Sequence, residues 1–133
     1  MKEPAARTWP AWVPVALHAL LIWIVSSISN PDFVPVADVP FQDKGVHFLV
    51  YGVFALLFAH AALETWPRRP LLAVFVLALV VTVLWGALDE VHQSFVPGRD
   101  SDPLDVLADA LGGLGGAALR LVPAALRRRA RPA

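Results

Sequence analysis

Residues 71–88 have the sequence LLAVFVLALVVTVLWGAL, in which nothing is more polar than Thr82. About 20 helical residues cross the roughly 30 Å hydrocarbon core of a bilayer, so this stretch predicts a transmembrane helix. A soluble helical protein of this size would need more polar surface than such a segment leaves it.

The composition of the whole chain agrees with this segment. Of 133 residues, 57% are apolar and 17% are charged, which lies outside the range of ordinary soluble domains. The chain has no cysteine, and this excludes disulfides, thiolate zinc sites, iron–sulfur clusters and thiol nucleophiles.

Three other apolar stretches are long enough to span a bilayer, and breaker motifs separate the four. Asn30-Pro31 closes the first helix, Trp66-Pro67 the second and Pro97-Gly98 the third, while Asp102-Pro103 provides an N-cap and a first-turn proline for the fourth. We therefore expect an all-α, four-helix transmembrane bundle that forms one domain over residues 1–133. The expected helices cover about residues 11–29, 45–63, 70–95 and 103–126.

The basic residues predict the orientation, because Lys and Arg are retained on the cytoplasmic side of a membrane. With both termini in the cytoplasm, nine of the eleven basic residues lie inside, and only Lys44 and Arg99 lie outside. The nine are Lys2, Arg7, Arg68, Arg69, Arg120, Arg127, Arg128, Arg129 and Arg131. This pattern predicts a multi-pass protein of the plasma membrane. A cleaved N-terminal signal peptide is the alternative, and it leaves the orientation of the remaining helices unchanged.

Polar side chains gather at the expected outer ends of the second, third and fourth helices. Nine of the eleven acidic residues lie on or near this outer side. Ionisable groups are tolerated at helix ends in a membrane only with water or partners. We therefore expect them to share one site, in which Arg99 grips a carboxylate or a ligand phosphate. The candidate ligand-binding residues are Asp43, Lys44, His47, Tyr51, Asp89, Glu90, His92, Gln93, Arg99, Asp102, Asp105 and Asp109.

Gly112 and Gly116 continue the helix face that carries Asp105 and Asp109. Small residues four apart allow another helix to approach closely. We expect this face to pack the fourth helix against the second or the third.

These residues form three blocks with a recognisable spacing. The blocks are Asp43-Lys44-x-x-His47-Phe48-x-x-Tyr51, Asp89-Glu90-x-x-Gln93-x-Phe95-x-Pro97-Gly98-Arg99 and Asp102-x-x-Asp105-x-x-Ala108-x-x-x-Gly112-x-x-x-Gly116. In order and spacing they resemble the VanZ-like family of small multi-pass membrane proteins, named for a member associated with resistance to the glycopeptide antibiotic teicoplanin. The resemblance covers the chain from about the first helix to Gly116, and it implies a membrane location and a four-helix core. The family usually has asparagine at the position of Asp109.

Three functions are compatible with such a site. The first is binding of a lipid-linked envelope precursor or a lipophilic glycopeptide-type ligand in an outward-facing acidic cleft that contains Arg99, with a role in antibiotic resistance. The second is a metal-dependent membrane enzyme acting on a lipid-linked phosphate, with carboxylates on Mg²⁺ and His47 or Glu90 as general base. Proton or ion conduction comes third, because it requires acids deep within several helices. Membrane lipids are the expected partners, nucleic acid is not, and the sequence identifies no cofactor.

Overall fold

The computed structural model describes residues 9–29 and 42–130. In this part the chain forms a short 3-10 helix, η1 (Trp9–Trp12), and four α-helices, α1 (Val13–Ser26), α2 (Gln42–Thr65), α3 (Leu71–Gln93) and α4 (Pro103–Arg129). The predicted all-helical fold is confirmed. The expectations that concern Lys2, Arg7, Asn30-Pro31 and Arg131 lie outside the described residues.

Helix α4 begins at the predicted motif and ends later than expected. The Asp102 side chain accepts a hydrogen bond of 2.9 Å from the Leu104 amide, which satisfies one of the free N–H groups of the first turn. At the other end the helix continues through Pro123 to Arg129. There Arg128 donates to the carbonyl oxygens of Pro67 and Arg69, at 2.8 and 3.1 Å, so the last turn holds the α2–α3 connection.

Helix α3 ends at Gln93, two residues before the expected limit of 95, because the chain turns there instead of continuing. The Val96 amide donates to the Gln93 carbonyl at 2.9 Å, and the Arg99 amide donates to the Val96 carbonyl at 3.1 Å. Gly98, with a φ of 77°, permits the backbone conformation of this connection.

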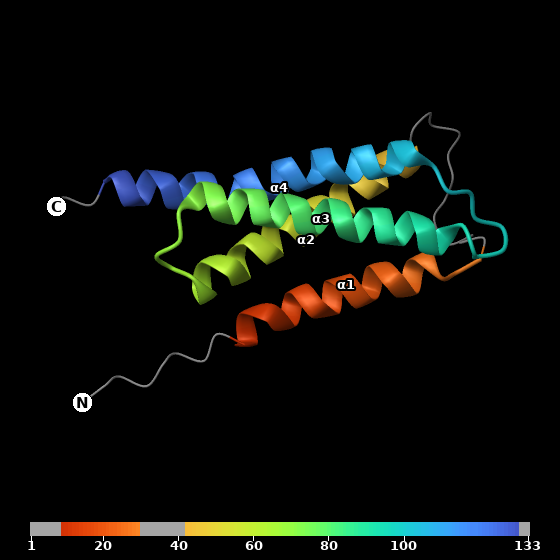
Figure 1. The fold of residues 1–133 in the computed structure, drawn as a ribbon, viewed down its shortest axis with the longest axis horizontal. Coiled ribbons are helices and arrows are strands. Elements are labelled where there is room, and N and C mark those ends of the chain that lie inside the picture. Colours follow the sequence, from red (N-terminus) through yellow and green to blue (C-terminus); the bar gives the residue numbers. More distant parts are fainter. Residues whose placement is uncertain (1–8, 30–41, 131–133) are drawn as a thin grey trace.

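Figure 1 shows that α1 ends, α2 begins, α3 ends and α4 begins at one end of the bundle, which we call the 94–102 end. Consequently α2 and α4 run parallel, and α3 lies antiparallel to both. Polar residues that open α2 and α4 and close α3 are thereby brought to the same end.

All four helical segments are long and apolar enough to cross a membrane. The 23 residues of α3 extend over about 35 Å at about 1.5 Å per residue. Large apolar side chains such as Leu20, Leu72 and Leu119 are more than half exposed, as suits a surface in contact with lipid. The chain is thus a multi-pass membrane protein.

Glycines bring α2 and α4 into backbone contact. A Cβ atom added at Gly112 would overlap the carbonyl oxygen of Phe48, and one added at Gly116 would overlap the carbonyl oxygen of Gly52. The predicted small-residue face therefore packs against α2. Gly113, which is also buried, lies against Thr82 of α3.

Helix α1 lies at the edge of the bundle and is held by a few polar contacts. Trp12 Nε1 donates to Thr65 Oγ1 at 2.8 Å, and His18 Nε2 donates to the Val50 carbonyl oxygen at 3.0 Å. Only Val15, Ile22 and Ser26 of α1 are buried.

The glycine contact yields a first prediction. Gly116→Val places a side chain where the Gly52 carbonyl lies, and it should lower the free energy of unfolding by about 2 kcal/mol or more, as overpacking does. Thermal unfolding in detergent measures this. Gly115→Ala is the matched control, because its Cβ would meet only the Phe48 ring at 3.9 Å. Equal melting temperatures for the two variants would contradict the assigned packing.

Candidate functional site

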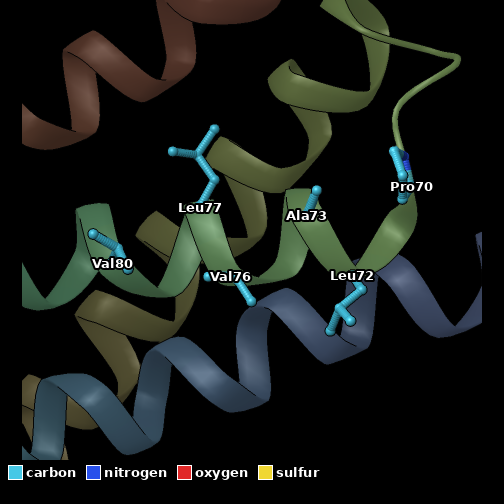
Figure 2. Close-up of a pocket in the computed structure, with 6 residues that line it drawn as sticks. All are labelled: Pro70, Leu72, Ala73, Val76, Leu77 and Val80. Atoms are coloured by element: carbon cyan, nitrogen blue, oxygen red, sulfur yellow. The ribbon is translucent and has the colours of Figure 1, made fainter.

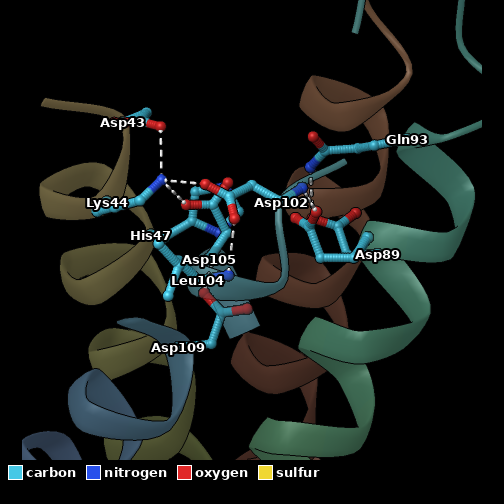
Figure 3. Close-up of polar contacts among 10 residues, drawn as sticks. Asp43, Lys44, His47, Asp89, Gln93, Asp102, Leu104, Asp105 and Asp109 are labelled. Carbon is cyan, nitrogen blue, oxygen red and sulfur yellow. Dashed lines mark hydrogen bonds and ion pairs between the residues drawn. The ribbon is translucent and has the colours of Figure 1, made fainter. Parts of the chain in front are cut away.

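A group of polar side chains from three helices meets at the 94–102 end, as Figure 3 shows. We call it the polar cluster. Its members are Lys44, His47, Glu90, Asp102, Asp105 and Asp109.

Lys44 is the cation at the centre of this group. Its Nζ atom donates to Asp43 at 3.0 Å, to Asp102 at 2.7 Å and to Asp105 at 3.0 Å. An ammonium group has three hydrogens to donate, so these three carboxylates use all of them. The Lys44 ammonium and, to a smaller degree, the Leu104 amide hold the pKa of Asp102 below its ordinary value.

His47 links α2 to α4 one turn further into the bundle. Its Nδ1 atom lies 2.9 Å from Asp109 Oδ1, a hydrogen-bonding distance, and its Nε2 atom lies 4.0 Å from Asp105 Oδ2. The imidazole is stacked on the Tyr51 ring, with centroids 6.0 Å apart and an angle of 8° between the planes. Its two carboxylate contacts at these distances, Asp105 and Asp109, therefore both come from α4.

Glu90 joins the end of α3 to the start of α4. Its Oε2 atom accepts a hydrogen bond of 2.9 Å from the backbone amide of Asp102, the residue that caps α4. Its other oxygen, Oε1, is buried and has no hydrogen-bond partner among the described residues. Beside it on α3, the Gln93 amide donates to Asp89 Oδ2 at 3.1 Å.

Several buried polar atoms near the cluster share this lack of a partner. They are Tyr51 Oη, Asp89 Oδ1, Glu90 Oε1 and Asp109 Oδ2, counted within residues 9–29 and 42–130. An unsatisfied buried acceptor costs about 1–3 kcal/mol, more when it is charged. Three of the four atoms are carboxylate acceptors and one, the Tyr51 hydroxyl, can donate, so the acceptors outnumber the free donors among these atoms.

Exposure falls steadily from the end of the bundle inward. The exposed side-chain fraction is 61% for Asp43, 40% for Asp102, 18% for Lys44, 8% for Asp105 and 0% for Asp109. Asp105 and Asp109 are thus the buried members of the cluster, whereas Asp102 and Asp43 reach the surface.

A hollow of about 520 Å³ lies elsewhere on the molecule, along the first half of α3 (Figure 2). Its lining is apolar and contains none of the candidate site residues. The lining residues are Pro70, Leu72, Ala73, Val76, Leu77 and Val80.

Arg99 does not join the carboxylates, contrary to expectation. Its guanidinium donates to the carbonyl oxygens of Val25 and Ile28, at 3.0 and 3.1 Å, at the end of α1. A cation is favourable there, because the last carbonyls of a helix lack partners and carry partial negative charge. The connection 94–102 thus uses Arg99 to hold α1.

His92 also lies away from the polar cluster. Its ring stacks on Trp23 with centroids 4.0 Å apart, and its Nε2 atom is 2.9 Å from Ser27 Oγ. Both partners belong to the end of α1, so His92 and Arg99 together fasten α1 to the rest of the bundle.

Gly86 contributes to the site, although the sequence analysis did not select it. A Cβ atom at this position would overlap the Asp109 carboxylate, so the glycine provides the space that this buried group occupies against α3. A glycine within an otherwise bulky apolar stretch is a weak signal of such a close approach.

Four helices long and apolar enough to cross a membrane, with buried carboxylates at one end of the bundle, define the class of multi-pass helical membrane proteins. The chain belongs to the VanZ/LLP1 family, whose model matches residues 6–123. No curated protein and no solved structure matches this chain.

The geometry of Lys44 leads to a second prediction. Lys44→Met keeps the length of the side chain but leaves the buried Asp105 without its cation. Loss of the charge partner of a buried carboxylate is destabilising, so this variant should melt clearly below the unmodified chain. Thermal unfolding in detergent at neutral pH measures the loss. Asp43→Asn, which alters the most exposed of the three partners, should change stability by less than about 0.5 kcal/mol; a similar loss in both would refute the central role of Lys44.

Proposed function

We propose that this protein binds the positively charged head group of a membrane amphiphile at the 94–102 end. The observation that supports the proposal is an excess of acceptors: Asp89, Glu90 and Asp109 each have a buried oxygen without a partner among the described residues, against one free hydroxyl donor, that of Tyr51. A primary ammonium group complements such acceptors in charge and in hydrogen-bond donors, as the Lys44 ammonium does for three other carboxylates of this end.

The contacts of the cationic side chains argue against direct binding of a phosphate. Lys44 uses its three hydrogens on carboxylates, and Arg99 is bound to the end of α1. A lipid-linked envelope precursor would thus have to be recognised through an amine or through a bound cation. A lipophilic glycopeptide-type ligand carries the required combination of apolar chain and amine, and its capture is the route by which this site would contribute to antibiotic resistance.

The alternative is a metal-dependent enzyme acting on a lipid-linked phosphate. One observation favours it, since His47, Glu90 and Asp105 offer ligand atoms within 4.8 Å of one another. Catalysis would also require a group that stabilises charge on the phosphate, and within the described residues near the cluster both cations are engaged. Binding is therefore the function that the geometry supports best.

A third prediction tests amine recognition directly. The full chain in nanodiscs of zwitterionic lipid, with excess chelator, should bind dodecylamine at least tenfold more tightly than dodecanol, because the two differ only in the head group. Glu90→Gln should remove most of this preference, since the amide keeps the contact with the Asp102 backbone and loses the charge. Calorimetric titration, corrected with empty nanodiscs, gives both affinities.

Arg99→Ala serves as the control for this binding experiment. Its guanidinium contacts only α1 carbonyls among the described residues, so the preference for the amine should persist in this variant. Equal affinities for the amine and the alcohol, or an unaltered preference in Glu90→Gln, would count against the proposed function.

The orientation is part of the same proposal: we place both termini in the cytoplasm and the polar cluster at the outer surface of the plasma membrane. The support is the distribution of Lys and Arg. A ligand from outside the cell would then meet the exposed Asp102 side of the cluster.

A fourth prediction addresses this orientation. The chain has no native cysteine, so single cysteines are unambiguous probes. Ser101→Cys, on the exposed 94–102 connection, should react with a membrane-impermeant maleimide in intact cells, whereas Glu64→Cys, near the opposite end, should react only after permeabilisation. The reverse pattern would place the cluster in the cytoplasm.

A further inference from the structure

We propose that His47, Glu90 and Asp105 form a binding site for a divalent transition-metal ion. Each of the three offers one ligand atom, and these atoms lie within 4.8 Å of one another. The residues come from three different helices, α2, α3 and α4, so an ion at this position would join the three helices at the 94–102 end.

Each of the three ligands is oriented by a partner on one atom and has a second atom left over. Asp109 holds His47 Nδ1, Lys44 holds Asp105 Oδ1, and the Asp102 amide holds Glu90 Oε2. The atoms left over are His47 Nε2, Asp105 Oδ2 and Glu90 Oε1, and the last is buried without any partner among the described residues. Glu90 itself is only 5% exposed, so water from the surface does not readily satisfy it.

The contact between His47 and Asp109 resembles the outer shell of known metal sites. Metal-bound histidines almost always donate their second ring nitrogen to a carboxylate or carbonyl, which fixes the tautomer and orients the ring. With the proton on Nδ1 and directed at Asp109, Nε2 carries a lone pair that faces Asp105 Oδ2 at 4.0 Å. His47 Nε2 and Asp105 Oδ2 are then two neighbouring acceptors, and a cation between them would be bound by both.

A direct hydrogen bond from a protonated His47 to Asp105 does not account for this spacing. Such a bond is typically about 2.7–3.2 Å long, and the measured separation is 4.0 Å. Two ligand atoms of one tetrahedral ion, each bound at about 2.0–2.2 Å, lie about 3.3–3.6 Å apart, a few tenths of an ångström closer than these two. An ion would thus fit between the two atoms after a small rotation of either side chain.

The donor set indicates the class of ion. Imidazole suits Zn²⁺ and other transition metals, whereas Mg²⁺ prefers oxygen ligands alone. One nitrogen and two carboxylate oxygens favour Zn²⁺ or Mn²⁺, and three protein ligands leave coordination positions open for water or a ligand group.

This inference rests on the proposed function, because the ion would occupy the same carboxylates as the amine. Glu90 cannot satisfy both an ammonium group and a metal ion with its one free oxygen. A bound ion would therefore compete with a cationic amphiphile, and the metal would regulate which head group the site accepts.

The test uses the full chain in zwitterionic nanodiscs, stripped with chelator and titrated with Mn²⁺ alone. Loss of the electron paramagnetic resonance signal of free Mn²⁺ should show one saturable site per chain, and Zn²⁺ should displace the bound Mn²⁺. Glu90→Gln and Asp105→Asn should each weaken binding at least tenfold. Asp109→Asn should weaken it about tenfold through the orientation of His47.

Asp43→Asn is the matched control, since Asp43 is an exposed carboxylate that contacts Lys44 and lies outside the three ligands. Its affinity for Mn²⁺ should stay within twofold of that of the unmodified chain. A non-saturable titration, or equal weakening in Asp43→Asn and Glu90→Gln, would overturn the metal site.

A measurement on the unmodified chain tests the metal site even if the variants do not fold. Zn²⁺, which is diamagnetic, should shift the ring resonances of His47 and leave those of His60, further along α2, unchanged; no shift, or an equal shift at both histidines, would refute the site. Dodecylamine binding in excess chelator is independent of the metal. If the chain binds dodecylamine but shows no metal site, only this inference is refuted. If the chain binds the metal but does not bind dodecylamine, the proposed function is refuted.

Discussion

Direct contact between the backbones of α2 and α4 sets the positions of all the polar groups. Gly112 packs on Phe48 and Gly116 on Gly52, a constant separation of 64 residues along two parallel helices. Other contacts between α2 and α4 join residues with nearly the same separation in sequence, 61 residues for Lys44 and Asp105 and 60 for His60 and Arg120. A slip of α4 by one residue would rotate its face by about 100°. The polar cluster therefore depends on a register that carbonyl oxygens and glycines define.

Much of this arrangement could be predicted from the sequence, because a membrane limits where helices begin and end. Once the spans were placed, Lys44, His47, Glu90 and Asp105 had to lie at one end, and Gly112 and Gly116 had to permit close approach. The route of the 94–102 connection could not be predicted. Arg99 finds main-chain carbonyls of α1 as acceptors, and such acceptors have no signature in the sequence.

The same limit applies to how deeply the carboxylates are buried. Sequence spacing predicts which side chains share a helix face, but their packing depends on the distance between helices. Gly86 allows the Asp109 carboxylate to reach α3, and the carboxylates close around Lys44 from both α2 and α4. Of the twelve candidate residues, nine belong to this cluster or are its buried neighbours, His92 and Arg99 hold α1, and Asp43 is an exposed contact of Lys44.

The built-in ammonium of Lys44 has a consequence for any ligand of this site. An incoming cation meets carboxylates that are already partly neutralised, and it must share or displace Lys44 to approach Asp105. Lys44 is 18% exposed on a flexible four-carbon chain, so its displacement toward Asp43 and Asp102 requires no movement of the backbone. In the proposed binding mode, the free energy that favours the ligand over Lys44 would come from buried carboxylate oxygens that have no partner among the described residues. Lys44 would return when the ligand leaves, so the buried carboxylates would stay compensated.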